Sequence, residues 1–119
     1  MASFGNIAPF ALAISLGILP TDAMAGTTAY VTGGLLKETM EECFKSIKSA
    51  ADKSGFTEYQ ETILDEDKKA GDFHADQKSS PLHLTARCDP REGVWSVAVS
   101  GIDEDQTLEG YNRFFKSFE

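Results

Sequence analysis

The polar middle of the sequence holds a cluster of side chains whose types suit a metal ion. Asp72, His74 and Asp76 alternate with other residues along the chain, and His83 follows close behind. In an extended chain, residues two apart project to the same side, so these three side chains can meet one cation such as Zn²⁺. We therefore consider a metal site at Asp72, His74 and Asp76, against the simpler interpretation of a solvated polar loop.

A second set of side chains suits a surface for a small ligand or a protein partner. His83 and Arg87 share the outward side of a predicted strand, and Tyr59 lies on another predicted strand. Exposed aromatic and arginine side chains are enriched at protein interfaces. The alternative is that Tyr59, His83 and Arg87 form the solvated side of a sheet whose other side is buried.

No signature of a catalytic site is present in the sequence. Asp65, Glu66 and Asp67 resemble the start of a calcium-binding loop, but Lys69 and Ala70 stand where a ligand and a glycine are required. Phosphate-binding loops, zinc-protease motifs and nucleophilic serine motifs are absent from the sequence. The aromatic residues have the spacing of core positions. We therefore predict no cofactor, and we favour a protein that is not an enzyme.

The two cysteines predict a disulfide bond. Cys43 lies with Met40 and Ile47 on the apolar stripe of a predicted helix, and Cys88 lies on the inward side of a predicted strand. Both cysteines therefore face the core, and in an exported chain one intramolecular bond is the natural expectation. The alternative is two buried free thiols in a reducing cytosol. A thiol oxidoreductase is not indicated, because the sequence has no Cys-x-x-Cys motif.

The start of the chain has the pattern of a secretory signal peptide. Residues 1–21 carry no charged side chain, residues 7–19 are nearly all apolar, and Ala23 and Ala25 complete an A-x-A cleavage site. The apolar run is too short to span a bilayer, which needs about 20 residues. We predict a signal peptide over 1–25, a periplasmic or secreted protein, and no membrane span after cleavage. The absence of Lys and Arg near the start departs from this pattern, and a buried N-terminal helix of a cytosolic protein is the alternative.

Composition predicts one globular domain over residues 26–119. Hydrophobic residues make up 41% of the chain and charged residues 25%, an ordinary balance for a folded protein. The net charge of −8 means that nucleic acid and anionic lipid repel the chain. Nucleic acid is therefore not a predicted partner, whereas a protein or a small ligand remains open.

Periodicity sets the order of the elements that position these residues. Strands are predicted at 27–32, 56–64, 82–88 and 93–100, with 56–64 at an edge, and helices at 36–55 and from 103 onwards. Residues 65–81 are predicted to be a long, mobile polar loop, although Phe73 and Ala75 allow the part near 72–76 to pair as an irregular strand. The order β-α-β-β-β-α predicts an α+β fold, a two-layer α/β sandwich. Its sheet is expected to be mixed and mainly antiparallel, with the helices packed on one face.

Three hypotheses for function follow from the sequence. The favoured one is a small exported, disulfide-linked domain that binds another protein or a small ligand and is not an enzyme. The second is a metal-binding protein or a metal-dependent enzyme that uses Asp72, His74 and Asp76. The third is a structural accessory domain of an envelope assembly.

Overall fold

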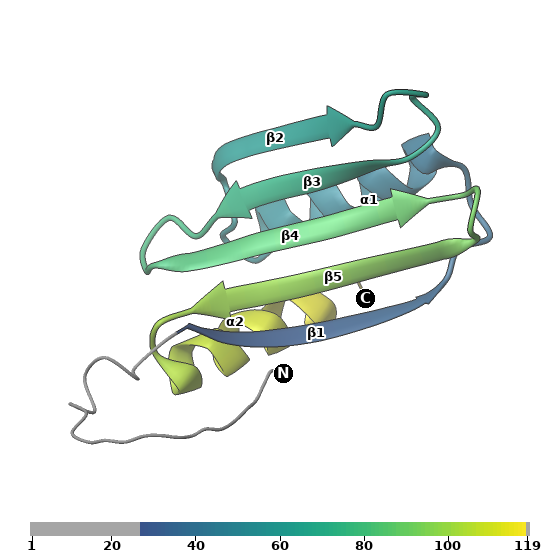
Figure 1. The fold of residues 1–119 in the computed structure, drawn as a ribbon. Helices are drawn as coiled ribbons and strands as arrows, with labels where there is room; N and C mark the ends of the chain where they lie inside the picture. The colour runs from purple at the N-terminus through teal and green to yellow at the C-terminus, as the bar shows by residue number, and fades with distance from the viewer. Residues whose placement is uncertain (1–26, 119) are drawn as a thin grey trace, which may run out of the picture.

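The structure, a computed structural model, describes residues 27–118 as two layers. One layer is an antiparallel sheet of five strands, and the other consists of two helices that cover the same face of the sheet (Figure 1). The elements follow one another as β1 (Thr28–Leu35), α1 (Met40–Lys53), β2 (Glu58–Leu64), β3 (Gly71–Asp76), β4 (Leu82–Asp89), β5 (Val94–Gly101) and α2 (Glu104–Lys116). The predicted signal peptide over 1–25 lies outside the described residues.

This architecture confirms the predicted α+β fold with both helices on one face, and it corrects two details. A further strand, β3, lies between β2 and β4, so residues 65–81 form two turns around a strand and not one long loop. Every strand pair is antiparallel, so the sheet is not mixed. The inward residues of β3 are buried, but its outward residues are acidic or histidine. This polar side lowers the apolar signal by which a strand is recognised.

The strands lie in the order β1-β5-β4-β3-β2, so β1 and β2 are the edges. The edge position predicted for residues 56–64 is therefore confirmed. β4 and β5 form the central hairpin, and their alternation buries Leu84, Ala86, Val97 and Val99 beneath the helices. This alternation is the reason why the hairpin was predictable from sequence.

The first helix begins later than its apolar stripe suggests. Thr39 accepts a hydrogen bond from the backbone of Glu42, whose side chain accepts one from the backbone of Thr39. This capping box fixes the helix start at Met40, although the apolar pattern begins at Leu36. After the C-terminal end, Gly55 has φ +92°, a left-handed conformation that glycine adopts without steric cost.

The second helix closes the core over β5 and β1. Asp103 caps its start by accepting a hydrogen bond from the backbone of Gln106 at 2.8 Å. Phe114 is fully buried, and its ring meets that of Phe56 edge to face, with centroids 6.3 Å apart. Buried residues of both helices, among them Ile47 of α1 and Phe114 of α2, belong to one hydrophobic core.

The predicted disulfide bond is present and joins the two layers. Cys43 of α1 and Cys88 of β4 are bonded, with their Cα atoms 6.2 Å apart. Both residues are buried. Within residues 27–118, no helix has the length and apolar character needed to cross a membrane.

Candidate binding surfaces

The face of the sheet opposite the helices is uncovered in the described structure and faces the viewer in Figure 1. Its side chains come from alternate positions of each strand, and the register aligns them in rows. One row contains Ile63, Asp72, Arg87, Ser96 and Gly33, and the next contains Glu61, His74, Thr85, Ala98 and Val31. The outward residues of β2, β3 and β4 form what we call the polar half, and those of β5 and β1 form the uncharged half.

At one end of the polar half, Arg87 is held by internal carboxylates. Its guanidinium donates to both oxygens of Asp65, at 3.2 and 2.6 Å, and to Asp72 at 3.2 Å. The hydrogen bond from Arg87 lowers the pKa of Asp65 below its ordinary value. This pairing ties the β2–β3 turn to the middle of the sheet.

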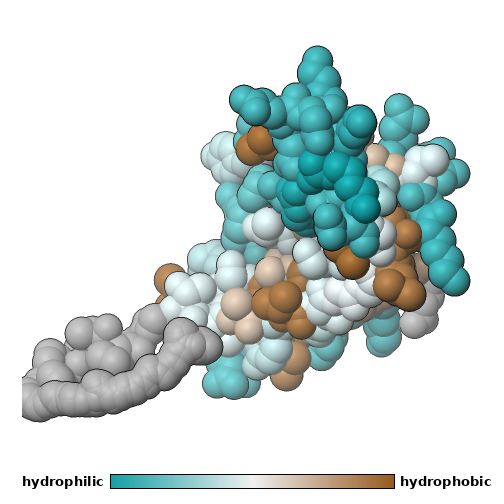
Figure 2. All heavy atoms as spheres, turned by 45° about the vertical axis from the view of Figure 1, so that its right-hand side comes forward, coloured by the Kyte–Doolittle hydropathy of each residue, from teal (hydrophilic) through white to brown (hydrophobic). Residues whose placement is uncertain are grey.

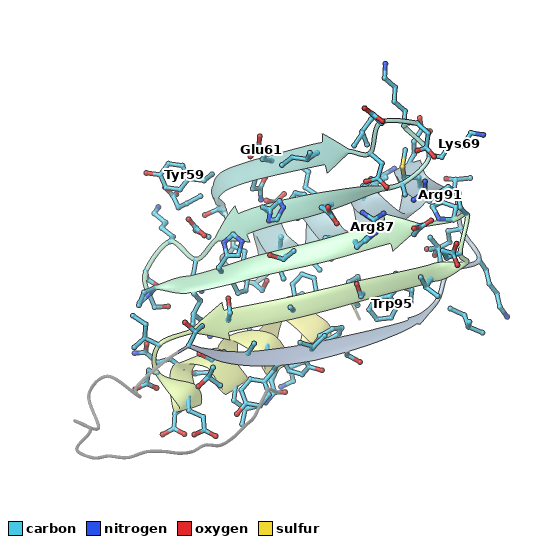
Figure 3. The ribbon with its side chains drawn as sticks, in the orientation of Figure 1. Tyr59, Glu61, Lys69, Arg87, Arg91 and Trp95 are labelled. Carbon is cyan, nitrogen blue, oxygen red and sulfur yellow. A yellow bond between two sulfur atoms is a disulfide. The ribbon has the colours of Figure 1, made fainter. Side chains whose placement is uncertain are left out.

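A second arginine extends this ion cluster to the β4–β5 turn. Arg91 donates to Asp67 at 2.6 Å, to Asp65 at 2.9 Å and to both oxygens of Asp89 at 3.1 Å. Figure 3 shows Arg87 and Arg91 at the same end of the sheet. The hydrogen bonds from Arg91 lower the pKa of Asp89 to about 2. Both arginines therefore have internal partners, and the cluster fixes two neighbouring turns against each other.

Towards the other end of the polar half, two histidines and an aspartate form a series of contacts. Asp76 Oδ1 lies 2.7 Å from His83 Nδ1, and His83 Nε2 lies 3.4 Å from His74 Nδ1. The two imidazole rings are inclined by 28° to each other, with centroids 5.6 Å apart. Thr85 Oγ1 lies 3.4 Å from the same His74 nitrogen. Asp76 and His83 are direct cross-strand partners on β3 and β4, whereas His74 is the direct partner of Thr85. The contact between His83 and His74 is therefore diagonal.

The three predicted metal ligands of β3 have the following partners in the structure. Asp72, His74 and Asp76 share one side of β3 as expected, but Asp72 bonds Arg87 and Asp76 bonds His83. Over residues 27–118, no group of three or more His, Cys, Asp or Glu side chains is placed to hold a metal ion. Sequence reasoning did not place His83 against His74. The outward position of His83 on the neighbouring strand is the signal that could have found this pair.

Of the predicted partner surface, the structure brings two members together. Tyr59 has a positive φ of 55° at an irregularity in the pairing of β2 with β3, and its side chain is 83% exposed. Tyr59 and His83 line one shallow depression of about 510 Å³. Arg87 lies further along β4, towards the opposite end of the sheet from Tyr59 (Figure 3).

The uncharged half of the face has a different character. On β1 the outward residues are Ala29, Val31, Gly33 and Leu35, of which Val31 is 66% exposed and Leu35 76% exposed. On β5 they are small residues next to them, Ser96, Ala98 and Ser100. Figure 2 shows hydrophilic residues gathered over the upper part of the molecule and paler or hydrophobic residues below. These outward residues carry no charge, and among residues 27–118 this surface ends at β1, an edge strand of the sheet.

A separate groove lies on the helix side, at the disulfide end of α1. It has a volume of about 360 Å³ and is lined chiefly by apolar residues, among them Leu36, Ile47, Trp95 and Phe115. Cys43 also lines it, although that residue is only 4% exposed. Few of its lining residues, chiefly Glu38 and Ser46, carry polar groups that could fix the orientation of a ligand. It is therefore a weaker candidate than the sheet face.

The chain matches no protein-family model, no curated protein and no solved structure.

Proposed function

We propose that this protein is an exported interaction module that binds an extended segment of another polypeptide along the free edge of β1. The observation that carries the proposal is the state of that edge. Within residues 27–118, β1 pairs with β5 over eight aligned positions, and no element pairs with its other side. A regular edge of this kind is a template for an added strand.

The backbone of β1 offers hydrogen bonds in the right direction. Leu36 N–H donates to Gly93 O at 2.8 Å. The even-numbered residues of β1 therefore direct their N–H groups towards β5. Because antiparallel ladders alternate, the N–H and C=O groups of Ala29, Val31, Gly33 and Leu35 are directed away from β5. These groups are available to a partner strand, which would supply affinity through main-chain hydrogen bonds.

The other edge of the sheet is protected, and this contrast supports the choice of β1. β2 has a register irregularity between Glu58 and Glu61, and both of these residues are charged. Bulges and charges are the usual devices that prevent strand addition. β1 carries neither, because no charged residue occurs from Thr27 to Leu36.

The charge near β1 indicates the chemistry of the partner. Tyr30 OH donates to Glu104 of α2 at 3.4 Å. Burial together with the Glu104 and Asp105 carboxylates raises the pKa of Tyr30. The helix side of the edge is thus acidic, as is the whole chain with its net charge of −8. A second copy of the protein would place two sets of these acidic side chains next to each other, which is unfavourable. We therefore propose a partner segment that has Lys or Arg on the side facing Glu104 and apolar residues on the side that contacts Val31 and Leu35.

The test uses a synthetic strand peptide in which Val and Lys alternate, titrated into the purified protein and followed by backbone amide NMR. Amide shifts are expected at Ala29, Val31, Gly33 and Leu35. Val31→Pro removes one outward N–H and should weaken binding roughly five- to tenfold, since one hydrogen bond contributes about 1 kcal/mol. Val31→Ala is the matched control, because it shortens the same side chain and keeps the N–H. The control on the ligand side is a peptide that carries N-methyl groups along the edge that would pair with β1.

Three outcomes would contradict the proposal. Equal binding of the N-methylated peptide would show that the backbone of β1 is not used. Shifts confined to β2 would place the binding edge on the opposite side of the sheet. Concentration-dependent dimerisation abolished by Val31→Pro would identify a second copy as the occupant of the edge.

A further inference from the structure

We propose that His74 and His83 form a binding site for a divalent transition-metal cation, represented by Zn²⁺. The site lies on β3 and β4, in the polar half of the sheet face. It is therefore separated from the edge of β1 by β5, and it does not depend on the function proposed above.

The distance between the two ring nitrogens fits such a cation. His74 Nδ1 and His83 Nε2 are 3.4 Å apart. Two imidazole nitrogens, each about 2.0–2.1 Å from a tetrahedral Zn²⁺, are themselves separated by about 3.3–3.4 Å. The cation would lie between these two nitrogens, in place of their present direct contact. Small rotations of the rings would direct both lone pairs to the cation.

Asp76 prepares His83 for this role. Its carboxylate accepts the Nδ1–H of His83 at 2.7 Å, which leaves the lone pair of Nε2 directed towards His74. A carboxylate that orients a metal-binding imidazole through its second nitrogen is a recurrent feature of zinc sites. Asp76 is therefore a positioning residue in this proposal, whereas the sequence pattern had suggested it as a ligand.

The coordination sphere would remain half open. With two protein ligands, the site agrees with the absence of any suitable group of three ligands among residues 27–118. His83 and Asp76 have side chains that are 45% and 43% exposed, so water can fill the remaining positions. Imidazole ligands favour Cu²⁺ over Zn²⁺, so Cu²⁺ should bind more tightly.

The test is direct because the chain contains two histidines and both belong to the site. Zn²⁺ is titrated into the purified full chain, produced without a polyhistidine tag, and followed by ¹⁵N NMR of the imidazoles and by calorimetry. We expect the signals of both histidines to shift together with about one equivalent of Zn²⁺, as a two-ligand site requires. EDTA should reverse the shift. His74→Ala and His83→Ala should each abolish this binding.

Two carboxylate variants separate the positioning role of Asp76 from a general effect of charge. Asp76→Asn should lower the affinity for Zn²⁺ about 10- to 100-fold, as loss of an orienting carboxylate does in known sites. Asp72→Asn removes the same charge from the same side of β3 and should leave the affinity unchanged, because Asp72 bonds Arg87. Circular dichroism and thermal melts confirm that each variant is folded.

The proposal is overturned if only one histidine signal responds to Zn²⁺, or if binding persists in both alanine variants. A loss of affinity in Asp72→Asn as large as that in Asp76→Asn would also overturn it, because the ligands would then be the three alternating residues of β3. Binding that disappears in Asp65→Asn and not in His83→Ala would place the cation in the acidic β2–β3 turn.

Discussion

Removing the disulfide bond is expected to cost this protein a large part of its stability. Cys43 and Cys88 join α1 to β4 across the core, and both are buried. The perturbation we consider is the double substitution Cys43→Ala with Cys88→Ala, compared with the double substitution to serine. Both pairs remove the same cross-link, but only serine leaves hydroxyl groups in an apolar environment.

The expected magnitude follows from the length of chain that the bond closes. The cysteines are 45 positions apart, and the chain-entropy relation for a loop of this length gives about 4 kcal/mol at 25 °C. Small domains have total unfolding free energies of about 5–15 kcal/mol. For a domain of this size, 1 kcal/mol corresponds to roughly 4–8 °C, so the melting temperature should fall by roughly 15–30 °C. Each buried serine hydroxyl without a partner should subtract about 1–3 kcal/mol more.

Urea unfolding with and without reductant measures these quantities. The alanine pair should lower the free energy of unfolding by about 4 kcal/mol and raise the m-value, since an unfolded chain without the cross-link exposes more surface. Reductant should destabilise the wild type to a similar extent and should leave the alanine pair unchanged. The stability order should be wild type, alanine pair, serine pair. A loss below about 1 kcal/mol for the alanine pair, or equal stability of the two pairs, would refute this reasoning.

Two further predictions concern the turns. Hydrogen bonds from Arg91 hold the pKa of Asp89 at about 2, below the ordinary value of about 3.9. The ionised Asp89 therefore stabilises the folded state above pH 4, and this stabilisation is lost as the pH falls towards 2. Asp89→Asn should therefore flatten the pH dependence of the urea midpoint between pH 4 and pH 2, and an unchanged slope would contradict this. Gly55→Ala should destabilise the protein more than Gly93→Ala. Both glycines have positive φ, but a Cβ at Gly55 would also meet Gln77 Nε2 at 2.8 Å, whereas none of the surrounding atoms lies within 4 Å at Gly93. Thermal melts measure the difference, and a larger loss at Gly93 would contradict the expectation.

Patterns that involve only a few neighbouring residues predicted most of the fold. The alternation of Leu82, Leu84 and Ala86 identified the core side of β4, and the helical spacing around Cys43 identified the core side of α1. These two inferences together predicted the disulfide bond, which the structure confirms. They succeed because side-chain direction in a helix or strand depends on the local backbone alone.

Features that depend on strand order were not predictable in the same way. β3 has an apolar side of Phe73 and Ala75 only, and its polar side faces outward because β3 lies inside a sheet that is covered on one face. The internal partners of Arg87 illustrate the same difficulty. Asp65 and Asp72 precede it by 22 and 15 positions. Asp72 meets it because β3 pairs directly with β4, and Asp65 meets it from the turn that leads into β3.

The geometry of the histidine pair depends on a turn that contains neither histidine. Residues 77–81 connect β3 to β4, and Gln77 N–H donates to Leu82 O at 2.9 Å, which fixes Asp76 opposite His83. Lys78 N–H donates to Gly55 O at 3.1 Å and anchors the same turn to the end of α1. A shift of one residue in this register would move His83 to the helix side of the sheet and separate it from His74. The spacing of histidines and aspartates in the sequence therefore cannot define the site, because the hydrogen bonds of the turn decide which of these side chains meet.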